Sequence, residues 1–203
     1  AQGRKVVWDG IRKDGQKVMS VWPDEIIAHR RNDEMKLELV NGSIWQVVGS
    51  DNFNSLVGSN PVGVVFSEYS LADPAAWDFI RPILAENGGW AMFIYTPRGR
   101  NHGYTLYQNA LKNENWHCEV LTADDTGTIT EEAIQAERDA GMPEEMIRQE
   151  FYCSFDAPLV GSIYGDQMFR AAQDDRITRV PHDESLSVDT WWDLGRSDAT
   201  AVW

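Results

Sequence analysis

Two short apolar runs constrain the fold of this chain more than any other feature. They are Val62-Gly-Val-Val-Phe66 and Trp90-Ala-Met-Phe-Ile-Tyr95, and neither alternates with polar residues. Such runs are typical of strands buried on both faces of a parallel sheet. A helical pattern lies between the two runs, and a second helical pattern follows the second run. This order predicts an α/β fold with a mostly parallel sheet and helices on both of its faces.

The expected helices around these runs have clear start and stop signals. Asp73 and Pro74 open the first helix as cap and first residue, Pro82 is expected to kink it, and Gly88 ends it. Asn101 caps the second helix, which follows the second apolar run. Each run should therefore lead directly into a helix of the sheet's covering layer.

The rest of the first 155 residues adds further elements. Residues 23–33 begin with Pro and two acidic residues, which predicts a helix. Residues 36–40 and 43–48 flank Asn41-Gly42, a strong signal for a β-hairpin in which both turn residues have positive φ. A third strand is expected at 117–121. A polar loop at 122–130 and helices at 131–140 and 143–151, separated by Gly141, complete this part.

The composition permits an ordinary globular core and limits the partners. Of 203 residues, 42% are hydrophobic, and the formal net charge is −14. So acidic a chain argues against nucleic-acid binding over its whole surface, although net charge does not report local patches such as Arg98 and Arg100. Cys118 and Cys153 belong to no metal-binding pattern and fit a reducing cytoplasm. No apolar run approaches the roughly 20 residues of a membrane span.

Polar residues follow both apolar runs, where a parallel sheet gathers functional groups. Ser67 and Glu68 come after the first run, and a carboxylate there can bind a metal or polarise an attacking water. Thr96-Pro97-Arg98-Gly99 comes after the second run, with a hydroxyl for sensing a γ-phosphate and a Gly for a sharp turn. The alternatives are that Glu68 only caps the next segment and that residues 96–99 form an ordinary turn.

A third polar strand end lies near the C-terminus. Trp192-Asp-Leu-Gly-Arg-Ser-Asp-Ala-Thr200 places Asp193 within a strand and Asp198 five residues on. This spacing fits a hairpin that presents carboxylates to a divalent metal, as two-metal phosphodiester cleavage requires. The alternative is a capped β-turn with Asp198 on the surface.

Several segments together resemble the large terminase subunits of tailed bacteriophages. They share the order and spacing of that family's motifs along nearly the whole chain. Residues 4–10 resemble the region after the family's phosphate loop, and residues 38–51 resemble the hairpin that leads into its Walker B strand. Val64-Val-Phe-Ser-Glu68 resembles the Walker B motif, and Tyr95-Thr-Pro-Arg-Gly99 resembles the coupling motif. Residues 150–155 and 161–164 resemble the passage between the two domains, and residues 193–200 resemble the first strand of the nuclease.

The resemblance implies a partial P-loop ATPase of the ASCE type followed by a nuclease. Residues 1–155 would be the ATPase domain without its N-terminal part, 156–187 a linker, and 188–203 the start of an RNase H-like domain. ATP with Mg²⁺ would serve the ATPase, and Mg²⁺ or Mn²⁺ the nuclease. The implied residues are Glu68, Thr96 and Asp193 for catalysis, Ser67 and Arg98 for cofactor binding, and Asp193 and Asp198 for metal.

The resemblance also implies a biological setting. ATP hydrolysis would drive viral double-stranded DNA into the procapsid, and the nuclease would cut concatemeric DNA. The partners would be the DNA, the portal protein, a small terminase subunit and further copies in a ring, with no membrane. The location would be the host cytoplasm and, transiently, the procapsid portal, and not the mature virion.

Two departures from the family pattern bear on these expectations. Ser67 stands where the family carries Asp before the Walker B Glu, so the site has one charge fewer. No Gly-x4-Gly-Lys-[Ser/Thr] is present; the nearest segment, Gly10 to Lys17, has its Lys one place late and leads into what reads as extended chain at 18–22. The phosphate loop is therefore expected before Ala1, and further nuclease carboxylates after Trp203. The isolated chain is expected neither to hydrolyse ATP efficiently nor to cut DNA.

Two other functions fit part of the pattern. One is a helicase-like or other P-loop motor without a nuclease, from which the Asp193 segment would distinguish a terminase. The other is a catalytically inactive remnant that binds DNA or the capsid, which Ser67 favours.

Overall fold

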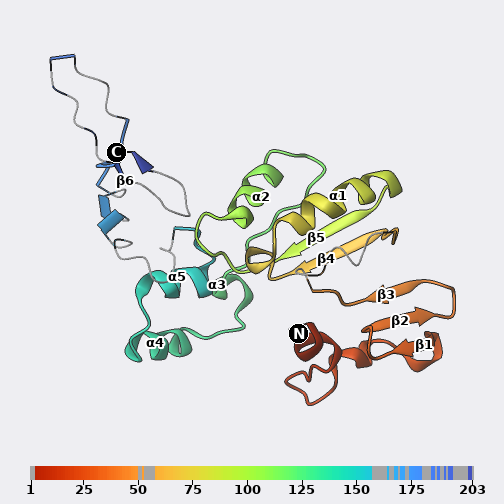
Figure 1. The fold of residues 1–203 in the computed structure, drawn as a ribbon. Helices are drawn as coiled ribbons and strands as arrows, with labels where there is room; N and C mark the ends of the chain where they lie inside the picture. Colours follow the sequence, from red (N-terminus) through yellow and green to blue (C-terminus); the bar gives the residue numbers. More distant parts are fainter. Residues whose placement is uncertain are drawn as a thin grey trace. The chain divides into compact units, whose positions relative to one another are not determined.

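The chain's structure, a computed structural model, describes residues 3–49, 52, 58–156, 164, 167–168, 170–171, 174–179, 184–185, 187, 190, 192–193 and 201–202. The chain divides into two compact units, Ala1–Val160 and Gly161–Trp203. The first unit contains both an antiparallel and a parallel sheet, and the second contains a short antiparallel pair (Figure 1). A mixed α/β class is thus confirmed, but the expectation of a mostly parallel sheet is not, because among the described strands only Gly63–Ser67 and Trp90–Ile94 pair in parallel; the P-loop ATPase fold remains a prediction.

The first unit begins with a small three-stranded antiparallel sheet. Its strands are β1 (Ile27–Arg31), β2 (Lys36–Leu39) and β3 (Ile44–Gln46), paired in the order β1-β2-β3. Three helical turns precede it, at Arg4–Trp8, Val18–Val21 and Asp24–Ile26. Trp8, Met19 and Leu37 form the buried centre of this part, and Trp22 and Trp45 lie against them.

The predicted hairpin is confirmed as β2 and β3, although its turn differs in detail. Gly42 donates its backbone N–H to the Leu39 carbonyl at 2.9 Å, and the Leu39 N–H bonds to the Ser43 carbonyl at 2.8 Å. Gly42 alone has a positive φ in this loop, +85°. These bonds are those of a three-residue loop that closes with a glycine bulge, so only one of the two turn residues needs the left-handed region.

The predicted helix at 23–33 is wrong. Only Asp24–Ile26 forms a helical turn, and the next five residues form β1. The strand pairs antiparallel with β2, with Arg30 opposite Leu37. Pairing with the hairpin thus overrides the local start signal, because helix propensity is weaker than tertiary contact. The expectation of extended chain at 18–22 is also wrong, since Val18–Val21 is a helical turn.

The predicted parallel pair of strands is confirmed. β4 (Gly63–Ser67) runs parallel to β5 (Trp90–Ile94), with Phe66 opposite Phe93. Helices α1 (Ala75–Asn87) and α2 (His102–Ala110) cover one face of this pair (Figure 1). The core between sheet and helices contains residues from all four elements. Its members are Phe66, Tyr69, Ala76, Ile80 and Leu84, with Val64, Ala91, Phe93, Tyr95 and Leu106 packed against them.

Burial of both sheet faces, predicted from the apolar runs, is wrong for the part of the chain that the structure describes. Val65, Met92 and Ile94 point away from the helices and are 52%, 51% and 55% exposed. The reason is that α1 and α2 both lie against the face that carries Phe66 and Phe93. An α/β parallel sheet normally has helices on both faces. The expected second covering layer is therefore not found among the described elements.

The helix signals near this sheet behave largely as predicted. The Asp73 carboxylate accepts a hydrogen bond from the Ala75 N–H at 2.9 Å, and the Asn101 side chain accepts one from the Gly103 N–H at the same distance. Gly88 ends α1 in the left-handed conformation with φ +60°. Pro82 lies inside α1, which continues through it to Asn87.

The predicted third strand at 117–121 is wrong. These residues are described, and they belong to no strand of the described sheets. His117 and Glu119 lie exposed, and the Leu121 carbonyl accepts a hydrogen bond from the Cys153 thiol at 3.4 Å instead of a strand partner. The loop expected at 122–130 contains a one-turn helix, α3 (Ala123–Thr126), which Thr122 and Asp125 stabilise with a reciprocal capping box.

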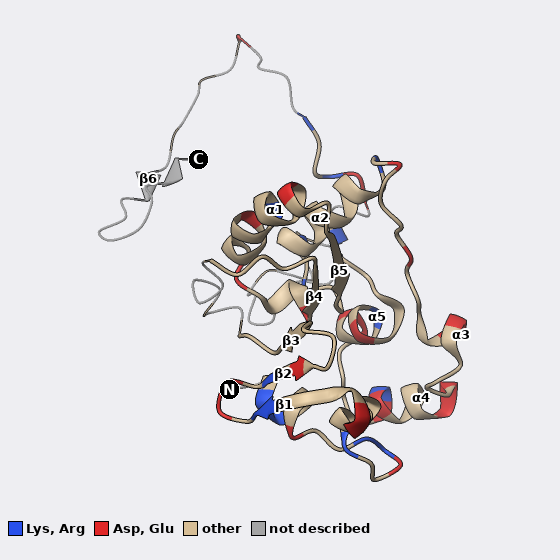
Figure 2. Cartoon of the chain, turned by 90° about the vertical axis from the view of Figure 1, so that its right-hand side faces the viewer, with Lys and Arg blue, Asp and Glu red and all other residues tan. Residues whose placement is uncertain are grey.

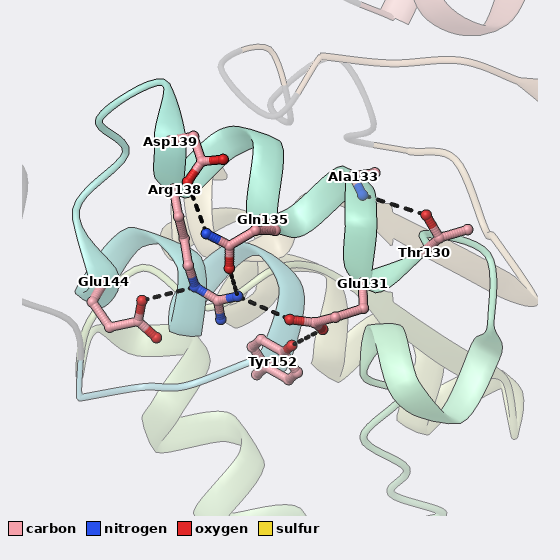
Figure 3. Close-up of polar contacts among 8 residues, drawn as sticks. All are labelled: Thr130, Glu131, Ala133, Gln135, Arg138, Asp139, Glu144 and Tyr152. Carbon is pink, nitrogen blue, oxygen red and sulfur yellow. Dashed lines mark hydrogen bonds and ion pairs between the residues drawn. The ribbon is translucent and has the colours of Figure 1, made fainter.

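The two helices predicted after this loop are confirmed as α4 (Glu131–Asp139) and α5 (Glu144–Tyr152). Gly141 separates them with φ +93°. Arg138 of α4 bonds to Glu144 of α5 at 3.1 Å and, within α4, to Glu131 at 3.0 Å, so the Glu144 bond connects the two helices (Figure 3). The Tyr152 hydroxyl donates to the other oxygen of Glu131 at 3.3 Å. These contacts raise the pKa of Arg138, so the guanidinium remains charged.

The second unit contains β6 (Trp192–Asp193) and β7 (Ala201–Val202), which pair antiparallel with Asp193 opposite Ala201. The domain limits 1–155, 156–187 and 188–203 stay predictions. None of the described helices is long and apolar enough to span a membrane.

Candidate functional site

The carboxyl ends of β4 and β5 bring the predicted ATPase residues to one edge of the sheet. Ser67, the last residue of β4, lies opposite Ile94, the last residue of β5. Glu68 therefore follows β4 at the level where Tyr95 and Thr96 follow β5. We call Ser67, Glu68 and Thr96 the carboxyl edge. Their proximity is a structural finding, whereas their catalytic and cofactor-binding roles stay predictions.

Glu68 has an unusual backbone conformation for a residue with a side chain. Its φ is +57° and its ψ is +47°, in the left-handed region. Such a conformation costs an L-residue about 1–2 kcal/mol relative to the right-handed one. The Glu68 side chain is exposed, whereas Tyr69 and Ser70 directly after it are buried, with 3% and 4% exposure. The fold thus holds an exposed carboxylate on a strained turn between a strand and two buried residues.

The turn that follows Glu68 is tied to the segment after β5 by side-chain hydrogen bonds. The Ser70 hydroxyl donates to the Thr96 carbonyl at 2.7 Å. The Asn101 side-chain amide donates to the Ser70 carbonyl at 2.8 Å. His102 Nε2 lies 2.7 Å from the Tyr69 carbonyl, which can only accept, so this nitrogen carries the hydrogen. The two strand ends are therefore joined beyond the sheet.

The loop from Thr96 to Arg100 is held at its other end by ion pairs. Gly99 has φ +61°, which confirms the sharp turn expected there. The Arg98 guanidinium donates to the Glu150 carboxylate of α5. Arg100 donates to Asp156 through Nε and Nη2, at 3.1 and 2.7 Å, and this bonding raises its pKa. To bind a phosphate as predicted, Arg98 has to share or leave its present carboxylate partner.

An aromatic layer lies behind the carboxyl edge. The Tyr69 ring contacts Phe93 at 4.7 Å and Phe66 at 5.5 Å between centroids, both edge to face. Burial, and secondarily the Asp78 carboxylate, raises the pKa of Tyr69. Burial is also the main cause that raises the pKa of Tyr95 to about 12, and its hydroxyl donates to the Gly103 carbonyl at 2.8 Å. Both phenols are therefore protonated near neutrality and serve as structural groups.

The carboxyl edge offers two possible ligands for a metal, the Ser67 hydroxyl and the Glu68 carboxylate. The described residues contain no group of three or more His, Cys, Asp or Glu side chains able to hold a metal. Mg²⁺ in nucleotide sites takes one or two protein ligands and completes its shell with phosphates and water. The Ser67 hydroxyl and the Glu68 carboxylate match that smaller requirement, and both residues are exposed.

Charged residues are unevenly distributed within the first unit. Acidic residues are frequent on α3 and α4, whereas Lys and Arg near the N-terminal turns and β1 are interspersed with Asp and Glu (Figure 2). Phosphate backbones bind to basic surface. The α3–α4 surface is therefore a poor candidate for contact with a phosphate backbone. Near β1, Arg31 is paired with Glu34 and Glu38, so its charge is largely balanced by carboxylates.

The second predicted site is described only in part. Asp193 lies in β6, whose antiparallel partner β7 supports the expected hairpin. Asp198 lies outside the described residues. The catalytic and metal-binding roles of both carboxylates stay predictions.

Sequence reasoning missed three residues that support the first site and one of the two contacts of a fourth. Ser70, His102 and Glu150 carried no recognisable signal, because each acts on a partner 26 to 52 positions away in the chain. Asn101 was expected to cap α2, and it does so with its side-chain oxygen. Its side-chain nitrogen makes a second contact, to Ser70, that the capping signal could not reveal.

Comparison with known proteins gives one informative similarity. The chain is 25% identical over 187 residues to the large terminase subunit of Escherichia phage T5, an alignment that covers 83% of this chain. The chain spans 40% of the length of that protein. No protein-family model matches the chain, and no solved structure matches it. The similarity supports a terminase-like relationship for this chain.

Proposed function

We propose that this chain is part of a large terminase subunit and that its carboxyl edge belongs to the ATPase site of a DNA-packaging motor. The single observation that carries the proposal is the pairing of β4 with β5, which places Ser67 and Glu68 beside Thr96. The similarity to the phage T5 large terminase subunit supports the same function independently.

In this proposal Glu68 orients and polarises the water that attacks the γ-phosphate of ATP. Its exposed carboxylate can accept a hydrogen bond from that water, which a general base must do. The Ser67 hydroxyl lies one residue before it, as a neutral ligand for a nucleotide-bound metal or its water. A bound Mg²⁺ would neutralise part of the negative charge on the phosphates. Thr96 at the neighbouring strand end would sense the γ-phosphate, and Arg98 would bind the nucleotide.

The test is ATP turnover by the whole protein that contains this chain. Glu68→Gln removes the charge with little change of shape and should reduce turnover by at least about 100-fold. Glu86→Gln, on the exposed surface of α1, is the matched control and should leave turnover unchanged. Equal turnover in the two variants would refute the role of Glu68.

We also propose that Asp193 and Asp198 contribute carboxylates to a metal-dependent nuclease in the whole protein. The antiparallel pairing of β6 with β7 supports a hairpin at this position. Asp193→Asn should abolish Mg²⁺- or Mn²⁺-dependent cutting of DNA while ATP turnover continues. Glu184→Gln, an exposed acidic residue of the same unit, is the control. Cutting that persists in Asp193→Asn would refute the role of Asp193, whereas an unsubstituted protein that turns over ATP but does not cut DNA would favour a motor without a nuclease.

The setting of the proposed motor follows from the terminase-like relationship. Viral double-stranded DNA, the portal of the procapsid, a small terminase subunit and further copies of the large subunit would be its partners. The site of action would be the host cytoplasm and the procapsid portal. An inactive DNA- or capsid-binding remnant is the competing function, and it predicts that Glu68→Gln changes nothing.

A further inference from the structure

We propose that Ser70 and Asn101 act as positioning residues that hold Glu68 in its left-handed conformation and thereby set the direction of its carboxylate. The inference rests on the proposed function, because it concerns the residue assigned there as the base. It adds two residues with no assigned role in the proposed reaction, of which Ser70 bonds to the backbone carbonyl of Thr96 and Asn101 bonds to Ser70.

The first step of the argument is the strain at Glu68. A residue with a side chain keeps φ +57° only where the surrounding structure determines its neighbours. Within the turn, the Leu71 N–H bonds to the Glu68 carbonyl at 2.9 Å, which is a local bond that a relaxed turn could also form. The restraint therefore has to come from the residues that fix Tyr69 and Ser70.

The second step is that both residues after Glu68 are fixed from the β5–α2 segment. Ser70 is buried, donates to the Thr96 carbonyl and accepts from Asn101, so its two polar groups bind two different points of that segment. Tyr69 is buried among aromatic rings, and its carbonyl accepts from His102. Rotation of Glu68 to the right-handed region would displace these groups and break the bonds.

The third step is that Asn101 links the turn to α2. Its Oδ1 caps α2 by accepting from the Gly103 N–H, and its Nδ2 donates to the Ser70 carbonyl. The two functions use different atoms of one amide, so they can be separated by substitution. Asp and Ser both cap helices well, and neither offers an amide N–H₂ to Ser70.

The experiment measures steady-state ATP hydrolysis by the whole protein, with Asn101→Asp and the uncharged Asn101→Ser as test variants. Both should lower kcat by about tenfold and change KM for ATP by less than about twofold, because the base is misdirected while nucleotide contacts remain. Thermal melting should show that both variants fold. Asn113→Asp is the matched control, because the Asn113 side-chain oxygen also accepts a hydrogen bond from the backbone N–H two residues later, at Asn115, and Asn113 does not bond to Ser70.

A double-mutant cycle decides between positioning and an independent effect. In a Glu68→Gln background, Asn101→Asp should cause no further loss of kcat, because the carboxylate that it positions is already absent. An equal further loss, or unchanged kcat in both Asn101 variants, would overturn the positioning role. If Glu68→Gln itself retains normal kcat, the proposed function fails instead, so the two failures are distinguishable.

Discussion

Ser70, in the turn after β4, donates a 2.7 Å hydrogen bond to the carbonyl of Thr96, which follows β5. This bond joins the two strand ends that the sequence marks as chemically important, at a point beyond the last paired residues Ser67 and Ile94. Ser70 is itself buried. A substitution that shifts either strand end should therefore affect the other.

The Ser70 bond should contribute measurably to stability. Ser70→Ala leaves the Thr96 carbonyl without this donor in a partly buried place, which costs about 1–3 kcal/mol in unfolding free energy. Ser20→Ala is a matched control, because Ser20 makes an equally short bond to the Lys17 carbonyl at an exposed turn. Its loss should cost less than about 0.5 kcal/mol. Urea denaturation of both variants measures the difference, and equal losses would contradict the importance of burial.

Strain at Glu68 predicts a difference in stability between two variants that both lose activity. Glu68→Gly and Glu68→Ala both remove the carboxylate, but only Gly adopts φ +57° without a steric cost. The Gly variant should be more stable than the Ala variant by about 1 kcal/mol, and both should lack ATP turnover in the whole protein. Chemical denaturation supplies the comparison. A less stable Gly variant would show that the turn is not strained.

Glu150 should compete with nucleotide for Arg98, if Arg98 binds the nucleotide as proposed. Glu150→Gln weakens the ion pair and should lower KM for ATP several-fold in the whole protein, whereas Arg98→Ala should raise it. The reference is Asp156→Asn, which weakens the neighbouring Arg100 pair without touching Arg98. A KM that is unchanged in both Arg98 and Glu150 variants would confine this ion pair to a structural role.

Tyr95 should make the folded state sensitive to alkaline pH. Its pKa is about 12 in the folded chain against an ordinary value near 10, mainly because of burial. The folded state keeps this proton at pH values where the unfolded chain has lost it. Stability should therefore be complete below pH 10 and fall as the pH rises towards 12. Denaturation at several pH values should show a shallower fall for Tyr95→Phe, and an identical fall would contradict this assignment.

The Arg138 contacts should hold α4 against α5. Arg138→Met removes the side-chain bond to Glu144 of α5 and two bonds within α4, to Glu131 and Gln135, and should lower the melting temperature (Figure 3). Arg138→Lys should also lower it, because one ammonium cannot match the planar fork of the guanidinium. Arg12→Met, in an exposed loop with Asp14 and Gln16, is the control and should have little effect.

The sequence identified the elements whose signals are local. The hairpin at Gly42, the cap at Asn101 and the strands β4 and β5 were all predicted from neighbouring residues, and the structure confirms them. The helix predicted at 23–33 failed because its residues pair with a strand later in the chain. The strand predicted at 117–121 failed because an apolar pattern cannot show whether a partner strand is available.

In the candidate site, too, some features follow from local sequence signals and others depend on contacts between distant residues. Glu68 and Thr96 could be singled out because they follow recognisable strands, and the parallel register brings them together. The left-handed conformation of Glu68 and its support by Ser70, Asn101 and His102 depend on contacts across 26 to 33 residues. No local pattern encodes such contacts, so they became visible only in the folded chain.

The central claim, that Glu68 at the carboxyl edge activates water for ATP hydrolysis, is tested most directly by comparing nucleotide binding with single-turnover cleavage in the whole protein. Glu68→Gln should bind ATP with an affinity within about threefold of the unsubstituted protein and cleave it at least about 100-fold more slowly, because the base acts on the transition state rather than on binding. Cleavage at the unsubstituted rate by the Glu68→Gln protein would contradict the account.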